Sequence, residues 1–347
     1  MMFAASADAQ RGDEAAAAVK LPATTLPFSG YASPEAEAAM AADLRDPQVP
    51  PSMTDLPAVR RFWQAYSDRA LAKMRRRFDV RTEHRTIGGV GVEVVTPASP
   101  DPRRTDRVLI NLHGGAFMWG AGSGALVEAV PIAAVARTTV VTVDYRLAPE
   151  HRFPAAVEDA VAVYQALLRT YRPEKIGIYG CSAGGALTAE ATAMIVQRKL
   201  PVPAAIGTLC GTGLPFGGDS AILGQLAMAQ PPAPSGVTVD PIPYFSGVTS
   251  NNPVAYPGNS KTMLAAFPPT LLLGGSRDFA LSAMATMSRR LEQAGVETHL
   301  QVFDGMGHAF FMNSDLPESL EAYQVISSFF DRQLSRSANA SSRRAKR

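Results

Sequence analysis

The sequence predicts an α/β protein in which a mostly parallel central sheet is flanked by helices. Short apolar segments alternate with longer segments of helical spacing, which is typical of a parallel sheet covered on both faces. The chain has 347 residues, of which 46% are hydrophobic and 18% charged, so it can bury a large core in one or two domains. One apolar segment runs directly into a serine placed between glycines, in YGCSAGGAL over residues 179–187. This arrangement suggests a functional residue held at the end of a strand.

Composition and charge exclude several classes of protein. The net charge of +2 at pH 7 gives no electrostatic reason to expect a nucleic-acid partner. The two cysteines, Cys181 and Cys210, form no CxxC motif, and no histidine pair has metal-ligand spacing. Neither a disulfide framework nor a structural zinc site is therefore expected. No apolar run approaches the roughly 18 residues of a membrane-spanning helix, so we expect no stable membrane insertion.

The two ends of the chain differ from the rest in composition. The first ten residues end in a small-x-small pattern, as before a signal cleavage site, but lack a basic start and an apolar stretch. We expect residues 1–30 to be a disordered start of a cytoplasmic protein. The alternative is the end of an export signal, which would make the protein exported. Residues 336–347 are rich in serine, alanine and arginine, which predicts a disordered basic tail.

The first regular elements are predicted between residues 31 and 95. Apolar residues recur at helical spacing over Asp55–Arg77, and we expect residues 31–80 to form N-terminal cap helices. The stretch Glu83–Val95 contains Gly88 and Gly89 between two β-rich arms, which predicts a hairpin.

Strands and helices are then predicted in alternation. The predicted strands are Val108–Leu112, Thr139–Val143, Lys175–Tyr179, Pro269–Leu273 and Thr298–Phe303. The predicted helices are Ala125–Ala136, Ala155–Leu168, Ala183–Arg198, Ser282–Ala294 and Glu318–Gln333. Active sites in such sheets lie beyond the carboxyl ends of the strands. Residues that directly follow a strand are therefore the candidates for chemistry.

One long segment interrupts the alternation. Between Leu200 and Ser260 only Asp219 and Asp240 are charged, and five prolines occur between residues 231 and 243. The segment is too long for an ordinary loop and too apolar for a solvated linker. We interpret it as a lid, inserted at about residues 211–260, that lies with the N-terminal helix across the carboxyl edge of the sheet. The alternative is a structural insertion packed away from any site.

Ser182 is the candidate nucleophile. Residues 180–184 (GCSAG) lie between a predicted strand and a predicted helix, as in the strand–turn–helix elbow that exposes a nucleophilic serine. Serine is a weak nucleophile at neutral pH and needs a base within hydrogen-bond reach, oriented by a third group. The sequence must therefore also supply a base and an acid.

His308 is the candidate base, because it lies in the loop just past the last predicted strand. Of the other histidines, His84 and His299 lie in strand-like stretches, His113 belongs to a glycine motif, and His151 follows a turn. None of these four has the position in the chain that the chemistry needs.

Asp278 is the candidate for the orienting acid. It comes just after the predicted strand Pro269–Leu273, between nucleophile and base, which gives the chain order Ser, Asp, His. Asp304 is an alternative, but it lies only four residues before the base and is better suited to shape that turn. Glu292 lies within a predicted helix and is a poorer candidate.

Backbone amides are the candidates for oxyanion stabilisation. A glycine pair, Gly114 and Gly115, follows His113 directly after the strand Val108–Leu112. We expect the N–H groups of Gly114, Gly115 and Ala183 to form the oxyanion hole. Each such donor typically lowers the barrier by ~2.7–4 kcal/mol. His113 is expected to hold this loop through hydrogen bonds.

A dinucleotide-binding fingerprint is the main competing interpretation. Residues 120–125 (GAGSGA) match G-x-G-x-x-A, and Asp144 follows the next predicted strand. The fingerprint turn must leave its strand directly, whereas here residues 113–119 intervene. This interpretation also leaves Ser182 and its partners without a role, so we disfavour it.

Taken together, these motifs resemble those of the hormone-sensitive-lipase-like esterases of the α/β-hydrolase superfamily. The resemblance spans about residues 80–333. It is carried by HGGAF (113–117), DYRLAPEHRFPAA (144–156), GCSAGG (180–185) and GMGHAF (305–310). It implies an α/β-hydrolase domain over residues 81–335 with a cap. It also implies a serine carboxylesterase for short- to medium-chain acyl esters that needs no metal or organic cofactor. Homodimers are frequent among the members.

Two positions depart from the family's pattern. Many relatives carry Asp where this chain has Cys181, and we interpret its thiol as a packed small residue. Relatives often read Asp-Pro-Leu where Asp278 is followed here by Phe-Ala-Leu. Two alternatives to an esterase stay open: hydrolysis of a lactone, carbamate or amide on the same residues, and a non-catalytic ligand-binding member of the fold. The complete Ser, Asp and His set argues against the second.

Overall fold

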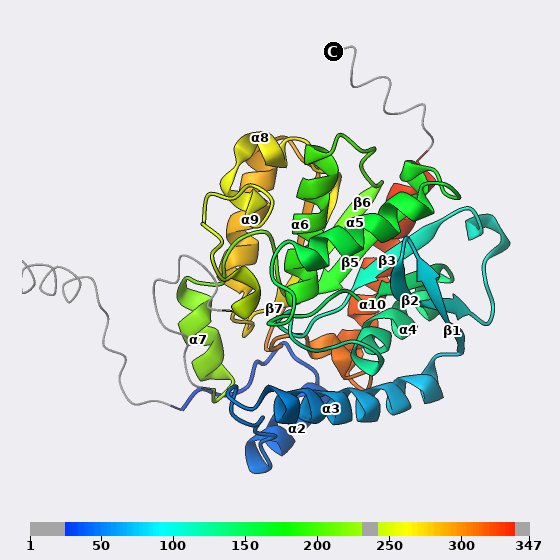
Figure 1. Ribbon diagram of the computed structural model, residues 1–347. Coiled ribbons are helices and arrows are strands. Elements are labelled where there is room, and N and C mark those ends of the chain that lie inside the picture. The colour runs from blue at the N-terminus through cyan, green and yellow to red at the C-terminus, as the bar shows by residue number, and fades with distance from the viewer. Residues whose placement is uncertain (1–24, 231–241, 337–347) are drawn as a thin grey trace, which may run out of the picture.

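The computed structural model describes residues 25–230 and 242–336. Within these residues an eight-stranded sheet has the order β1-β2-β4-β3-β5-β6-β7-β8 (Figure 1). The strands are β1 (Val80–Ile87), β2 (Val90–Pro97), β3 (Val108–Leu112), β4 (Thr139–Val143), β5 (Ile176–Cys181), β6 (Ala205–Leu209), β7 (Thr270–Gly275) and β8 (Thr298–Phe303). Only β2 pairs antiparallel, with β1 and β4, and every pair from β4 to β8 is parallel. The predicted mostly parallel sheet is confirmed.

The hairpin predicted over Glu83–Val95 is formed by β1 and β2. Gly88 and Gly89 both have positive φ, 62° and 83°, as the tight turn of a two-residue hairpin requires. A side chain at Gly88 would also place its Cβ 2.5 Å from the Ala162 carbonyl oxygen. Glycine at this position therefore allows the hairpin to lie against a neighbouring helix.

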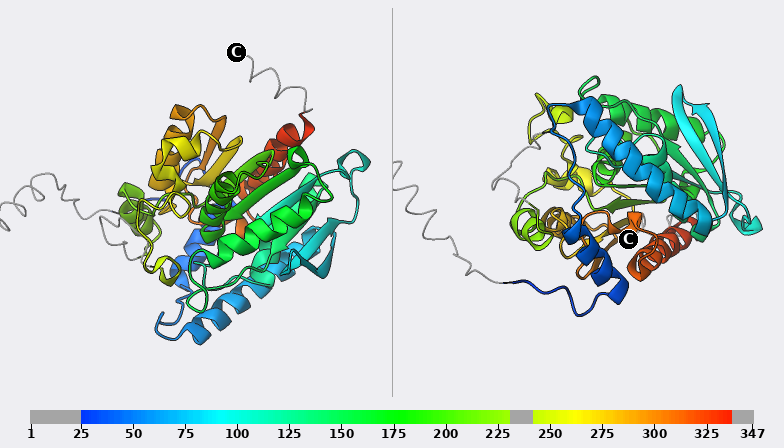
Figure 2. Two further views of the ribbon diagram at one scale, coloured as in Figure 1. Left: turned by 45° about the horizontal axis from the view of Figure 1, so that its top comes forward. Right: turned by 90° about the horizontal axis from the view of Figure 1, so that it is seen from below.

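Helices cover both faces of the sheet (Figure 2). The helices are α2 (Pro34–Arg45), α3 (Leu56–Arg77), α4 (Ser123–Ala136), α5 (Ala155–Leu167), α6 (Ala183–Gln197), α7 (Asp219–Ala227), α8 (Lys261–Leu264), α9 (Leu281–Gln293) and α10 (Pro317–Ser335). Ile110 and Ile178 face the core under α5, α6 and α9, whereas Leu109 and Tyr179 face the core under α4 and α10. Successive strand residues point to opposite faces, so each face of the sheet packs against its own core of buried apolar residues. Among the described helices, none is both long and apolar enough to span a membrane.

The segment Leu200–Ser260 is not all insertion, because its first part contains a strand of the sheet, while the lid at about residues 211–260 stays a prediction. Ala205–Leu209 forms β6 in the middle of the sheet, between β5 and β7, and all five residues are buried. A short strand buried on both faces shows no alternation of polar and apolar residues, so its pattern does not separate it from an apolar insertion. Residues 231–241, with most of the proline cluster, lie outside the described residues, as do residues 1–24 and 337–347.

Helix α3 lies along the carboxyl end of the sheet (Figure 1). Asp55, directly before the helix, is its N-cap, and its carboxylate accepts from the Ala58 N–H at 3.0 Å. Arg60 donates to the Met118 carbonyl oxygen at 2.8 Å and pairs with Glu150 at 2.7 Å. These contacts fix α3 to the loops that follow β3 and β4, where the candidate site lies.

Candidate active site

Ser182 lies at the turn between β5 and α6, in a backbone conformation that few residues adopt. Its φ and ψ are 58° and −120°, and such strain in a non-glycine residue is characteristic of functional sites. The turn passes close to β3: a Cβ at Gly180 or Gly184 would lie 2.2 Å or 1.8 Å from the Leu112 carbonyl oxygen. The two glycines are therefore needed for the elbow to form.

Three residues predicted from the sequence meet at the carboxyl edge of the sheet. Nε2 of His308 lies 2.9 Å from Oγ of Ser182, and Nδ1 of the same ring lies 2.8 Å from Oδ1 of Asp278. His308 follows β8, Ser182 follows β5 and Asp278 follows β7. These distances are those of a nucleophile, a base and an orienting acid.

Asp278, not Asp304, is the acid bonded to the histidine. Asp278 is fully buried, and its Oδ1 also accepts from the Ala280 N–H at 2.8 Å. Asp304 instead accepts from the Ser29 hydroxyl, and the hydroxyls of Ser29 and Ser276 lower the pKa of its carboxyl. Asp304 thus joins the N-terminal segment to the turn before His308.

An aromatic wall lies beside the histidine. The ring of Phe279 stacks on the His308 imidazole with centroids 4.2 Å apart and planes at 27°, and Phe216 meets Phe279 edge-on at 5.2 Å. Phe279 occupies the position where relatives often have proline. The departure can be read from the sequence, but the contact between the two rings cannot.

His113 holds the loop that follows β3. It is fully buried, its Nδ1 lies 2.7 Å from the Gly114 carbonyl oxygen, and its own carbonyl accepts from the Tyr145 hydroxyl at 2.7 Å. Burial lowers the pKa of His113 to about 4, so the ring is neutral and its Nδ1–H donates to the carbonyl. The role expected for His113 agrees with this geometry.

The structure changes the expected set of oxyanion donors. The Gly114 N–H donates to Oε1 of Glu128 at 2.7 Å, so it is not available to a substrate and we withdraw it as a donor. The N–H groups of Gly115, Ala116 and Ala183 donate to no group in the described part of the chain. On this loop the N–H groups left without an acceptor among the described residues are therefore those of Gly115 and Ala116, one residue further along than expected, which the motif itself does not reveal.

The two cysteines are packed residues. Cys181 is buried directly before the nucleophile, and burial raises the pKa of its thiol well above the ordinary value. Burial raises the pKa of the Cys210 thiol to about 11, and its Sγ accepts from the Ala309 N–H at 3.3 Å. Both thiols are thus neutral, and neither is an activated nucleophile.

Neither a metal site nor a dinucleotide site emerges from the described residues. The one candidate metal cluster found there combines Cys210, Asp278 and His308, with ligand atoms within 4.8 Å of one another. Two of these residues are already bonded to each other, so we assign no metal site. For the dinucleotide fingerprint, β3 ends at Leu112 and α4 begins at Ser123, so no strand turns directly into this helix.

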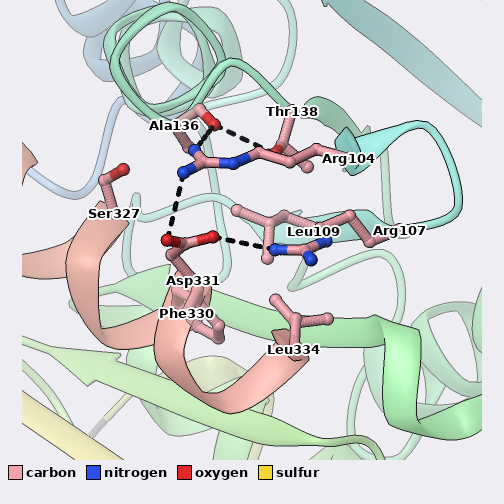
Figure 3. A pocket seen from close by; sticks show the side chains of 9 residues that line it. All are labelled: Arg104, Arg107, Leu109, Ala136, Thr138, Ser327, Phe330, Asp331 and Leu334. Atoms are coloured by element: carbon pink, nitrogen blue, oxygen red, sulfur yellow. Dashed lines mark hydrogen bonds and ion pairs between the residues drawn. The ribbon is translucent and has the colours of Figure 1, made fainter. Parts of the chain in front are cut away.

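A small pocket at the other end of β3 is lined in part by ion-paired side chains (Figure 3). Asp331 pairs with Arg104 at 3.0 Å and with Arg107 at 2.8 Å. Arg107 directly precedes β3, whereas the residues of the candidate site follow the strands. These pairs therefore tie α10 to the sheet and take no part in the chemistry.

Comparison with known proteins identifies the family of this chain. A family model described as an alpha/beta hydrolase fold matches residues 109–312. The chain belongs to this family. An esterase of Acinetobacter venetianus is 29% identical over 255 residues, which cover 71% of this chain and 80% of that protein. An acetyl-hydrolase of Streptomyces hygroscopicus is 28% identical over 260 residues, covering 70% and 80%.

Solved structures extend the likeness of this α/β hydrolase to nearly the whole chain. The esterase E25 matches with a TM-score of 0.78 and 27% identity, covering 91% of this chain and 99% of that one. An esterase of the bacterial hormone-sensitive lipase family matches with a TM-score of 0.74 and 29% identity, covering 87% and 99%. The resemblance to hormone-sensitive-lipase-like esterases is confirmed.

Proposed function

We propose that the chain is a serine carboxylesterase that hydrolyses short- to medium-chain acyl esters through an acyl-enzyme intermediate. The observation that carries this proposal is the continuous hydrogen-bonded series from Ser182 through His308 to Asp278, at 2.9 and 2.8 Å. The relatives named esterase and acetyl-hydrolase support the same reaction class.

His308 acts first as base and then as acid. It takes the proton from the Ser182 hydroxyl while Oγ attacks the ester carbonyl carbon, and it gives that proton to the leaving alcohol. Water then attacks the acyl-enzyme by the same route and releases the carboxylic acid. Asp278 holds the Nδ1–H tautomer and stabilises the imidazolium that forms in each half-reaction.

Backbone amides receive the negative charge of the tetrahedral intermediate. The N–H of Ala183 lies next to the nucleophile, and Gly115 and Ala116 supply the donors of the facing loop. Donors fixed before the reaction need no reorganisation when the charge forms. A substrate carbonyl would therefore lie between the start of α6 and the loop after β3.

A cap assembled from two separate parts of the chain favours apolar substrates. Helix α3 holds the loop after β3. In the inserted segment, Tyr244 stacks on Phe117 with ring centroids 4.0 Å apart, and Met228 lies against Gly307 beside the histidine. These contacts are largely apolar, so we expect little activity on charged esters. Turnover of a charged short ester faster than that of a butyrate ester would contradict this.

Steady-state hydrolysis of p-nitrophenyl butyrate tests the proposal. Ser182→Ala is expected to lower kcat by on the order of 10⁴–10⁶, because the triad acts as a unit. Circular dichroism of the purified variant checks that it is folded. Substantial turnover by folded Ser182→Ala protein would overturn the proposed function.

Two further expectations stay predictions. The homodimer implied by the family is checked by light scattering of the purified protein. The cytoplasmic location, with export as the alternative, is checked by fractionation of the producing cells.

A further inference from the structure

We propose that Glu128 is a positioning residue that holds the oxyanion loop and the nucleophile elbow in register. The inference rests on the proposed function and deepens it, because it names a side chain that sets the geometry of the oxyanion donors. Glu128 lies in α4, outside each of the motifs described above. Its buried carboxylate contacts both catalytic loops.

Both carboxylate oxygens of Glu128 are hydrogen-bonded. Oε1 accepts from the Gly114 N–H at 2.7 Å. Oε2 accepts from the Cys181 N–H at 3.2 Å and from Nδ2 of Asn111 at 3.1 Å. Asn111 is in turn fixed by the Thr142 hydroxyl, which donates to its Oδ1 at 2.7 Å. The side chain thus joins β3, β4 and the elbow after β5.

The two backbone contacts lie next to the proposed oxyanion donors. Gly114 directly precedes Gly115, and Cys181 directly precedes Ser182 and Ala183. One carboxylate therefore determines how far the loop after β3 lies from the start of α6. A misplacement of about 1 Å in such a site can cost ~10²-fold in rate.

A carboxylate at this position is costly, which argues against a role in packing alone. Glu128 is 4% exposed, and burial, partly offset by the three donated hydrogen bonds, raises the pKa of its carboxyl to about 8. An apolar side chain would fill the same space without the cost of desolvation. All three partners are donors, and the ionised form accepts from them without adding an O–H donor of its own.

The groups that face Glu128 are neutral acids or amides. The Tyr179 hydroxyl donates to the Glu128 main-chain oxygen at 3.2 Å, and Tyr145 and Cys181 lie near enough that a charge on Glu128 raises their pKa values. Within the described residues no basic side chain donates to this carboxylate. When the carboxyl is ionised, its charge is therefore stabilised by oriented N–H groups.

The variant Glu128→Gln tests the proposal at about pH 8.5, above the pKa of about 8 of the wild-type carboxyl. The amide has nearly the same volume but turns an NH₂ group toward one of the donors. We expect kcat on p-nitrophenyl butyrate to fall about 10- to 100-fold with little change in KM. Affinity for a butyl boronic acid, which forms a tetrahedral adduct on Ser182, is expected to fall in parallel.

Asp101→Asn is the matched control, because Asp101 is a buried acid at the opposite end of β3. It caps a short helix by accepting from the Arg103 N–H at 3.0 Å. Its replacement is expected to lower stability and to leave kcat and boronic acid affinity unchanged. This control separates loss of stability from loss of oxyanion geometry.

A second variant keeps the proposal testable if Glu128→Gln does not fold. Asn111→Ala removes one of the three donors and leaves the carboxylate in place, so we expect a smaller parallel loss of kcat and boronic acid affinity. Wild-type values of both in the variant that folds would overturn the role of Glu128. So would a loss of kcat with unchanged boronic acid affinity. An inactive wild-type protein would instead overturn the proposed function.

Discussion

His308 connects two side chains that lie far from it in the sequence. Its ring is bonded on one side to Ser182 and on the other to a carboxylate that is fully buried. Burial keeps water from competing for the carboxylate, so the ring is held in one tautomer and one orientation. Geometry therefore decides which acid, Asp278 or Asp304, orients the ring, and variants of the two residues test this directly.

Asp278→Asn is expected to lower kcat by about 10⁴, because an amide favours the wrong tautomer of His308. Asp304→Asn is the matched variant, since Asp304 contacts Ser29 and not the imidazole. It is expected to keep kcat within about threefold of wild type. Steady-state kinetics of both variants measure the difference. Equal losses in the two would contradict the assignment of the acid.

Glu128 is expected to change how the free energy of unfolding depends on pH. Burial raises its pKa from the ordinary value of 4.5 to about 8. Between these pH values the folded chain keeps a proton that the unfolded chain has released. The stability that this group contributes is therefore fully present below about pH 4.5 and is lost as the pH rises toward 8.

Urea unfolding of wild type and Glu128→Gln at several pH values measures this effect, because all other titrating groups are common to both proteins. The free energy of unfolding of wild type, minus that of the variant, is expected to fall as the pH rises from about 5 to about 8. A difference that grew with pH would show instead that folding lowers the pKa of Glu128.

The candidate triad could be predicted from the sequence because each member follows a strand and lies in a short motif. Glu128 could not, because it acts from a helix and reaches its partners through the fold. The one signal was a single acid in the otherwise apolar helix Ser123–Ala136. The sequence also does not reveal that the Gly114 N–H is hydrogen-bonded, because its acceptor, Glu128, lies 14 residues away.

Helix α3 is the element that ties the N-terminal part of the chain to the site. Its Arg60 forms a two-pronged pair with Glu150 and also donates to the carbonyl oxygens of Met118 and Ala148. The guanidinium thus bridges the loops after β3 and β4. Helical spacing predicts α3, but it does not reveal the partners of Arg60, because they lie in loops far along the chain.

Arg60→Gln is expected to lower the free energy of unfolding by about 1–3 kcal/mol, since two carbonyl groups and a carboxylate lose a charged donor. Arg61→Gln is the control, because Arg61 is the next residue and is exposed. It is expected to change stability by less than about 0.5 kcal/mol. Denaturant titration compares the two, and similar losses would argue against the bridge.

Strand β6 shows where element prediction from patterns reaches its limit. Its five residues are enclosed by β5, β7 and helices, so neither face needs polar residues. The other parallel strands were predicted because helical segments flank them. β6 is followed instead by the long insertion, which removes that cue.

The whole molecule positions the chemistry through its sheet. Parallel strands β5, β7 and β8 end at one edge, so residues that follow them meet there although 126 positions separate Ser182 from His308. The loop after β3, the neighbour of β5, carries the amides proposed for the oxyanion hole. The central claim is that this edge makes a single serine nucleophilic.

Covalent labelling with a fluorophosphonate, followed by mass mapping of peptides, tests that claim most directly. We expect one adduct per chain, on Ser182, with labelling that is nearly abolished in His308→Ala. A folded wild-type protein that stays unlabelled, or a label on another residue, would contradict it.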